Sequence, residues 1–111
     1  MNISKQDKLK KEYQKIFAAF IERESNKTSL ITVTRCELSN DYKNLIVYFS
    51  VFPENQEDKV LAFLSRNKKE ARDYLKKNIS TRILPFVNFA IDEGEKNRQQ
   101  IDQILIKDKL R

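Results

Sequence analysis

The residues with the clearest chemical potential are the cations between positions 66 and 83. This stretch holds seven basic residues and two acids, so it carries +5 of a formal net charge of +6. Lys69, Arg72 and Lys76 follow one another at helical spacing, which predicts a basic stripe on one helix face. A focused basic element of this kind is the electrostatic signature of a phosphate-rich partner. Taken alone, the same run also fits a solvated helix face without a partner.

The chain lacks the residues that most catalytic and metal-binding sites require. The chain has no histidine, which removes the usual general base and the usual zinc ligand. Cys36 is the only cysteine and Gly94 the only glycine, so a zinc site, a P-loop and a dinucleotide fingerprint cannot be built. We therefore expect a protein that is not an enzyme, with no catalytic residue, metal, cofactor or small-molecule substrate.

Length and composition fit a single domain over residues 1–111. Hydrophobic residues make up 40% of the chain and charged residues 34%, which is typical of a folded, highly charged protein. No apolar run approaches the roughly 20 residues of a membrane-spanning helix, so we expect no membrane partner. A single cysteine cannot form an internal disulfide, which favours the reducing cytoplasm. We expect the chain to be a monomer.

The hydrophobic pattern predicts elements in the order α-β-β-α-α-β-α. Ser4 and Asp7 resemble a capping box, and an apolar stripe at helical period continues to about residues 23–26. A change of parity near Thr34 and Arg35 predicts a β-bulge in the first strand. We expect strands at 29–39, 44–52 and 85–92, helices at 57–67 and 68–77, and a last helix at about 95–110.

These elements predict an α+β fold in which helices cover one face of a three-stranded sheet. The second and third strands are joined through helices, so they should be parallel under the right-handed crossover rule. We expect the first strand to lie between them and to run antiparallel to both.

Two segments of the chain resemble the bacterial ribosome-binding factor A family. They run from Arg23 to Pro53 and from Arg82 to Gly94, and several separate motifs occur in the family's order. The resemblance extends over about residues 9–105. The matching positions are Thr32, Val33, Glu37, Ser39, Asp41, Val47, Tyr48, Ser50, Arg82, Pro85, Phe89 and Asp92.

The resemblance implies a type II KH-like domain that binds the small ribosomal subunit and its rRNA late in maturation. It also implies support of rRNA 5′-end processing, notably in the cold. KH domains hold a nucleic-acid backbone with a glycine-rich loop between two helices. The segment KKNIS, which we assign to that loop, has no glycine, and Asn78 takes the place of the family's helical bend. We therefore expect contact with structured RNA through shape and phosphate.

The resemblance and the charge distribution together give the candidate RNA-binding residues. The resemblance transfers Lys76, Lys77, Asn78 and Arg82. The charge distribution adds Lys68, Lys69 and Arg72. We expect the cations of the stripe and of the bend to be exposed, because the chain nearby offers few acidic partners. Arg23, Lys27 and Arg35 form a second rank.

Two functions of other classes fit parts of the same pattern. An interaction domain that recognises an acidic protein partner would show the same salt-sensitive binding but would survive treatment with ribonuclease. A small enzyme that uses carboxylates alone would turn over its substrate without RNA and would lose activity when one Asp or Glu is replaced.

Overall fold

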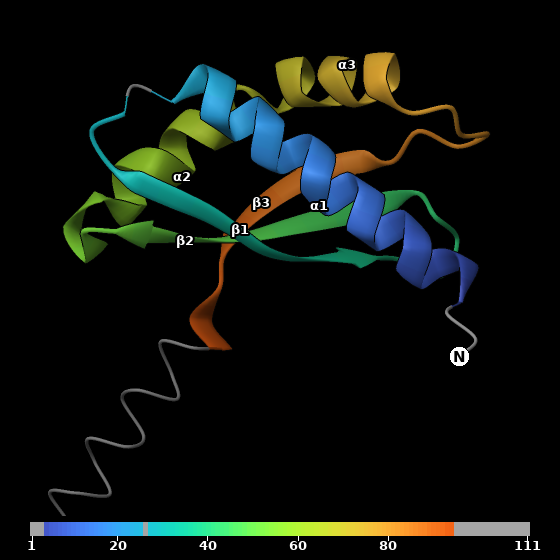
Figure 1. Cartoon of the computed structure of the whole chain (residues 1–111), viewed down its shortest axis with the longest axis horizontal. Helices are drawn as coiled ribbons and strands as arrows, with labels where there is room; N and C mark the ends of the chain where they lie inside the picture. Colours follow the sequence, from blue (N-terminus) through green and yellow to red (C-terminus); the bar gives the residue numbers. More distant parts are fainter. Residues whose placement is uncertain (1–3, 26, 95–111) are drawn as a thin grey trace, which may run out of the picture.

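The computed structural model describes residues 4–25 and 27–94, in which three α-helices lie on one side of a three-stranded sheet (Figure 1). The elements are α1 (Lys5–Glu24), β1 (Leu30–Leu38), β2 (Asn44–Phe52), the 3-10 helix η1 (Glu54–Gln56), α2 (Glu57–Arg66), α3 (Lys68–Asn78) and β3 (Phe86–Ile91). The predicted α+β layers are confirmed. The helix expected at about 95–110 lies outside the described residues.

Helix α1 begins at the predicted cap and supplies much of the core. The Ser4 hydroxyl accepts a hydrogen bond from the Asp7 N–H at 3.0 Å, which satisfies one free donor of the first turn. The buried side chains of α1 repeat at helical spacing; they are Tyr13, Phe17, Phe20 and Ile21. The Phe17 ring meets the Phe89 ring of β3 edge-on, with centroids 6.1 Å apart. The apolar stripe therefore packs on the sheet as predicted.

Strand β2 forms the middle of the sheet and buries one complete face. Alternate residues point into the core, and these are Leu45, Val47, Phe49 and Val51. Residues of the opposite parity lie on the outer face, where Tyr48 is half-buried and Phe52 is 73% exposed. The period-2 pattern thus identified the core face correctly.

The predicted order of the strands is wrong, because β2 and not β1 lies in the centre. Strand β1 pairs antiparallel with β2, and β2 pairs parallel with β3, which confirms the predicted directions of those two pairs. The outer edge of β1 is occupied by α1. The Gln6 amide donates to the carbonyls of Leu38 and Ser39, and the Gln14 amide donates to those of Val33 and Thr34. β3 therefore joins at the free edge of β2.

The predicted bulge in β1 is present. The register with β2 shifts between Val33 and Arg35, so that Val33 pairs with Phe49 and Arg35 with Tyr48. The shift keeps Val33 and Cys36 both in the core although they have opposite parity. At the bulge, the Thr34 hydroxyl lies 2.5 Å from the Asp92 carboxylate, directly after β3, and donates to it.

Candidate nucleic-acid interface

Four of the candidate cations are exposed and have no ion-pair partner within the described part of the chain. Lys69 lies in the first turn of α3, Lys76 and Lys77 lie in its last turn, and Arg82 lies in the loop that leads to β3. Their side chains face solvent, so their charge is available to a partner. Cations in the last turn of a helix also interact favourably with the helix dipole, which gives Lys76 and Lys77 a stabilising role without any partner.

Arg72 differs from these four, and the expectation that it is exposed is wrong. Its side chain is half-buried, and its guanidinium donates to the carbonyl of Leu84 at 3.0 Å and to that of Pro85 at 3.1 Å. The same group lies over the Phe86 ring, 4.6 Å from the centroid. The stripe expected from sequence is therefore interrupted, because Arg72 ties α3 to the segment before β3. Lys68 is also half-buried, and its Nζ donates to Asn88 of β3 at 2.9 Å.

The break between two helices lies at Asn67 and not at Asn78. Asn67 has φ −109° and ψ 23°, between the end of α2 and the start of α3. Helix α3 continues through Asn78 and ends where Ile79 becomes extended. Both asparagines donate a side-chain hydrogen bond to the carbonyl four residues earlier, so their local signals are alike. Only after Asn67 does a further apolar helical face, with Ala71 and Leu75 buried, require the helix to resume.

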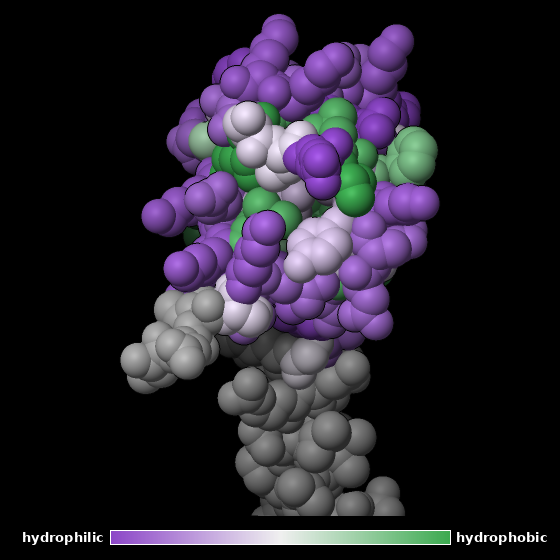
Figure 2. Space-filling model, turned by 90° about the vertical axis from the view of Figure 1, so that its right-hand side faces the viewer, coloured by the Kyte–Doolittle hydropathy of each residue, from purple (hydrophilic) through white to green (hydrophobic). Residues whose placement is uncertain are grey.

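The end of α3, its following loop and the start of α1 lie together at one end of the molecule (Figure 1). We call this surface the basic end and define it by Lys5, Lys8, Lys76, Lys77 and Arg82. Figure 2 faces this end and shows an apolar hollow ringed by hydrophilic side chains. The basic end combines unpaired cations with an accessible apolar surface.

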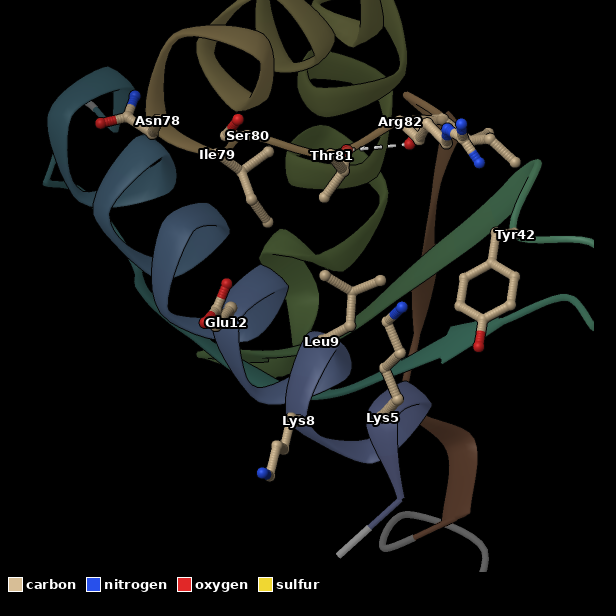
Figure 3. A pocket seen from close by; sticks show the side chains of 11 residues that line it. Lys5, Lys8, Leu9, Glu12, Tyr42, Asn78, Ile79, Ser80, Thr81 and Arg82 are labelled. Atoms are coloured by element: carbon tan, nitrogen blue, oxygen red, sulfur yellow. Dashed lines mark hydrogen bonds between the residues drawn. The ribbon is translucent and has the colours of Figure 1, made fainter.

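A cavity of about 620 Å³ opens at the basic end. In Figure 3, Ile79 and Thr81 point from the loop toward Leu9 and Lys5 on α1, while Tyr42 borders the opposite side. Arg82 lies at the rim, and Lys8 points away from the middle of the cavity. The cavity brings the candidate residues Asn78 and Arg82 next to side chains from the first turns of α1, more than sixty positions earlier in the chain.

Arg23 and Lys27, two of the second-rank candidates, are engaged within the chain. The Arg23 guanidinium pairs with Glu24 at 2.9 Å and lies 4.7 Å from the centroid of the Tyr74 ring. Lys27 Nζ lies 2.6 Å from Glu22, and this hydrogen bond is the main reason why the pKa of Glu22 is lowered. A phosphate would have to compete with these contacts, although both pairs are exposed to solvent and therefore weak.

Arg35 lies in a denser cluster on the outer face of the sheet. Its guanidinium is 3.8 Å from the centroid of the Tyr48 ring, pairs closely with Glu37 and approaches Asp92 at 3.6 Å. The bond to Glu37 is the largest cause of the raised pKa of Arg35. The pKa of Asp92 is lowered, chiefly by the hydrogen bond from Thr34, with burial opposing this effect. Arg35 is thus held between two carboxylates and an aromatic ring.

Comparisons with known proteins agree over nearly the whole chain. The family model described as ribosome-binding factor A matches residues 5–105. The chain belongs to the ribosome-binding factor A family. Ribosome-binding factor A of Thermobifida fusca is 30% identical to it, over 98% of this chain and 74% of that protein. The homologue of Natranaerobius thermophilus is also 30% identical, over 95% of this chain and 82% of that one.

Solved structures of the family have the same fold. The crystal structure of ribosome-binding factor A from Thermus thermophilus gives a TM-score of 0.69 at 28% identity and covers 76% of this chain and 92% of that one. A homology model of the Thermus thermophilus factor, fitted into a cryo-EM map of its complex with the 30S subunit, gives a TM-score of 0.62 at 29% identity, over 78% of this chain and 89% of that one. The layers described above are consistent with the KH-like fold expected of ribosome-binding factor A.

In this member of the ribosome-binding factor A family, the connection between the two KH helices is the single residue Asn67. Its neighbours Arg66, Lys68 and Lys69 make it a basic position without a glycine-rich loop. Lys5 and Lys8 are not among the residues predicted from the sequence, although residues 1–28 carry a net charge of +3. The relevance of these two lysines depends on the packing of α1 beside residues 78–83, which no local pattern signals.

The described residues bear on three other kinds of site, which are a metal site, a reactive thiol and a membrane span. Residues 4–25 and 27–94 contain no cluster of three or more His, Cys, Asp or Glu side chains arranged to bind a metal. Cys36 is buried, which raises the pKa of its thiol to about 12. Among the helices of these residues, none has the length and apolar character that crossing a membrane requires.

Proposed function

We propose that this chain binds the small ribosomal subunit through its rRNA during late maturation, as a non-catalytic assembly factor. The observation that carries the proposal is the set of unpaired cations at the basic end of a chain whose family is named for ribosome binding. Lysines and arginines that meet phosphates release condensed counterions, which provides affinity without sequence readout. The basic end is a surface of this kind.

The mode of contact follows from the connection between α2 and α3. A KH domain with a glycine-rich loop brings its backbone close to four nucleotides of a single strand. Here a single asparagine replaces that loop. The chain therefore binds structured RNA by shape and phosphate, with the candidate residues Lys76, Lys77, Asn78 and Arg82 as the primary contacts. Lys69 extends this surface along α3, while Lys68 and Arg72 act mainly by holding α3 against the β3 segment.

Co-sedimentation with purified subunits tests the proposal. The chain should sediment with free small subunits and not with large subunits, and binding should weaken steeply as salt is raised. Equal sedimentation with both subunits would reduce the interaction to nonspecific attraction between charges. Binding in extract that survives ribonuclease would favour instead an acidic protein partner, which is the alternative that the same cations could serve.

The finer role that the family resemblance implies is support of rRNA 5′-end processing, notably in the cold. We include it in the proposal, together with action as a monomeric single domain in the cytoplasm. Replacing the host's own factor with this chain should restore growth at low temperature and remove unprocessed 5′ ends. Accumulation of unprocessed ends despite normal binding to the subunit would limit the function to binding.

A further inference from the structure

The cavity at the basic end is lined by both apolar and charged side chains. Leu9 of α1 and Ile79 of the loop give it an apolar floor, and both pack partly against the hydrophobic core. Lys5 and Arg82 lie on opposite sides of it, and neither has an ion-pair partner among the described residues. The cavity is open to solvent, and its volume of about 620 Å³ is within the range of clefts and cavities that bind small ligands, roughly 300–1,000 Å³. Glu12 of α1 also lines the cavity, while three cations, Lys5, Lys8 and Arg82, outnumber it. An apolar floor with a net cationic rim suits a ligand that is part aromatic and part anionic.

Tyr42 lines the cavity with an aromatic ring, and its backbone has an unusual conformation. Its φ is 64°, in the left-handed region that glycine or asparagine adopts more easily. The turn around it is held by hydrogen bonds from the Ser39 hydroxyl to Asp41, at 2.6 Å, and from the Lys43 N–H to Asp41, at 3.1 Å. A bulky residue in this conformation costs on the order of 1–3 kcal/mol, and such positions cluster at functional sites. Tyr42 is half-buried and packs partly against the hydrophobic core, which fixes its ring at the side of the cavity.

We propose that this cavity receives one unpaired nucleotide of the bound RNA. The base lies against the Tyr42 ring and the apolar floor, and its phosphate lies between Lys5 and Arg82. Unstacked bases of single-stranded loops, bulges and ends are commonly bound on aromatic side chains, whereas a duplex cannot enter a concave site of this size. The inference rests on the proposed function, because it assigns the RNA as the source of the nucleotide.

Titration of the free chain tests the cavity without the ribosome. The probes are adenosine 5′-monophosphate, uridine 5′-monophosphate and inorganic phosphate, followed through the backbone amide signals in NMR spectra. Both nucleotides should shift the amides of Leu9, Tyr42 and Ile79, and inorganic phosphate should shift them much less. If phosphate shifts the same amides with the same affinity, or if the nucleotides leave Tyr42 unchanged, the proposal is overturned.

Substitutions at Tyr42 separate the ring from the turn. Tyr42→Asn removes the ring and suits the left-handed backbone, so it should weaken nucleotide binding at least about fivefold, as loss of base stacking does. Tyr42→Phe keeps the ring and should bind like the wild type. Phe52→Asn removes an aromatic ring that is 73% exposed at the other end of β2 and serves as the matched control. Equal affinity of Tyr42→Asn and the wild type would exclude a role for the ring.

Sedimentation with small subunits distinguishes failure of this inference from failure of the proposed function. Tyr42→Asn should bind subunits more weakly than Phe52→Asn does. If the wild type sediments with subunits but no nucleotide occupies the cavity, only the inference is wrong. If the wild type binds nucleotides but does not sediment, the proposed function is wrong, and with it the ribosomal source of the nucleotide.

Discussion

Cations in two regions of this molecule have opposite surroundings. At the basic end, Lys76, Lys77 and Arg82 face solvent without an acidic partner among the described residues. On the outer face of the sheet, Arg35 pairs with Glu37, approaches Asp92 and lies over the Tyr48 ring. The first region leaves positive charge for a phosphate, whereas the second neutralises it within the chain.

The charge that a sequence carries is therefore not the same as the charge that is available to a partner. A phosphate that approached Arg35 would meet two carboxylates at close range, and it would have to displace them from the guanidinium. A phosphate that approached Arg82 would not have to displace a carboxylate, because Arg82 is exposed and has no ion-pair partner among the described residues. We therefore expect binding energy to come from the basic end, with little from Arg23, Lys27 and Arg35.

The largest expected effect comes from removing the cations of the basic end. Lys76→Ala, Lys77→Ala and Arg82→Ala together should weaken binding to the small subunit and lower the slope of log affinity against log salt. Each phosphate contact contributes roughly 0.7–0.9 to that slope, so the triple variant should lose about 2–3. Sedimentation at several salt concentrations measures both quantities.

The control removes the same net charge from cations that are engaged within the chain. Arg23→Ala, Lys27→Ala and Arg35→Ala together should leave the salt slope near that of the wild type. Urea unfolding of both triple variants shows whether each remains folded. If the two triple variants lose affinity equally, net charge alone governs binding and the contrast between the regions has no functional meaning.

Arg72 lies in the basic stretch of residues 66–83, yet its guanidinium is engaged within the chain like that of Arg35. Arg72→Ala removes hydrogen bonds to the carbonyls of Leu84 and Pro85 and uncovers the Phe86 ring. Hydrogen bonds from a charged donor contribute roughly 1.5–3 kcal/mol, so we expect the free energy of unfolding to fall by about 1–3 kcal/mol. Lys69→Ala, on the same helix but exposed, should change it by less than about 0.5 kcal/mol. Equal losses in urea unfolding would make Arg72 an ordinary surface residue.

Features set by neighbouring residues were predictable from the sequence. The stripe of α1, the core face of β2 and the bulge near Thr34 all follow from local periodicity, and all three are present. The direction of the β2–β3 pair also followed, because the crossover rule is a general constraint on chain topology.

Features that depend on distant contacts were not predictable. The central place of β2 depends on the two glutamines of α1 that occupy the outer edge of β1. The Thr34 hydroxyl meets a carboxylate 58 positions away, at Asp92. Asn67 and Asn78 have the same local chemistry, so only the apolar residues after Asn67 show which of them marks the bend. Likewise, the sequence presents Arg72 and Lys76 as equals although only one contacts the backbone before β3.

Protonation of Asp92 at low pH should lower the stability of the folded chain around Arg35. The carboxylate of Asp92 accepts hydrogen bonds from Thr34 and from the Gly94 N–H, and its side chain is only 12% exposed. Its pKa in the folded chain is lowered from the ordinary value of 3.8, chiefly by the Thr34 bond. A lowered pKa contributes stability that is present above about pH 3.8 and is lost as the pH falls through the folded value.

The free energy of unfolding should therefore decrease as the pH is lowered below about 4, and Asp92→Asn should flatten this part of the curve. Asp58→Asn removes one carboxylate from the exposed part of α2 and controls for the change in net charge. Urea unfolding between about pH 3 and 6 provides the measurement. Identical acid slopes for the wild type and Asp92→Asn would show that this carboxylate does not stabilise the cluster.

The smallest expected effect concerns Asn78, a neutral residue among the cations of the basic end. Its amide donates to the Tyr74 carbonyl at 2.8 Å in an exposed last turn, and alanine favours a helix more than asparagine does. Asn78→Ala should therefore change stability by less than about 0.5 kcal/mol. If Asn78 donates to RNA, as we propose, affinity should fall about two- to tenfold, which is the contribution of a single hydrogen bond. The salt slope should not change, because no charge is removed.

The matched control for this prediction is Asn55→Ala, which replaces an exposed asparagine in η1 and should bind like the wild type. If Asn78→Ala binds with unaltered affinity at every salt concentration, the role of Asn78 is only to end α3. Recognition at the basic end then depends on its cations and on Tyr42.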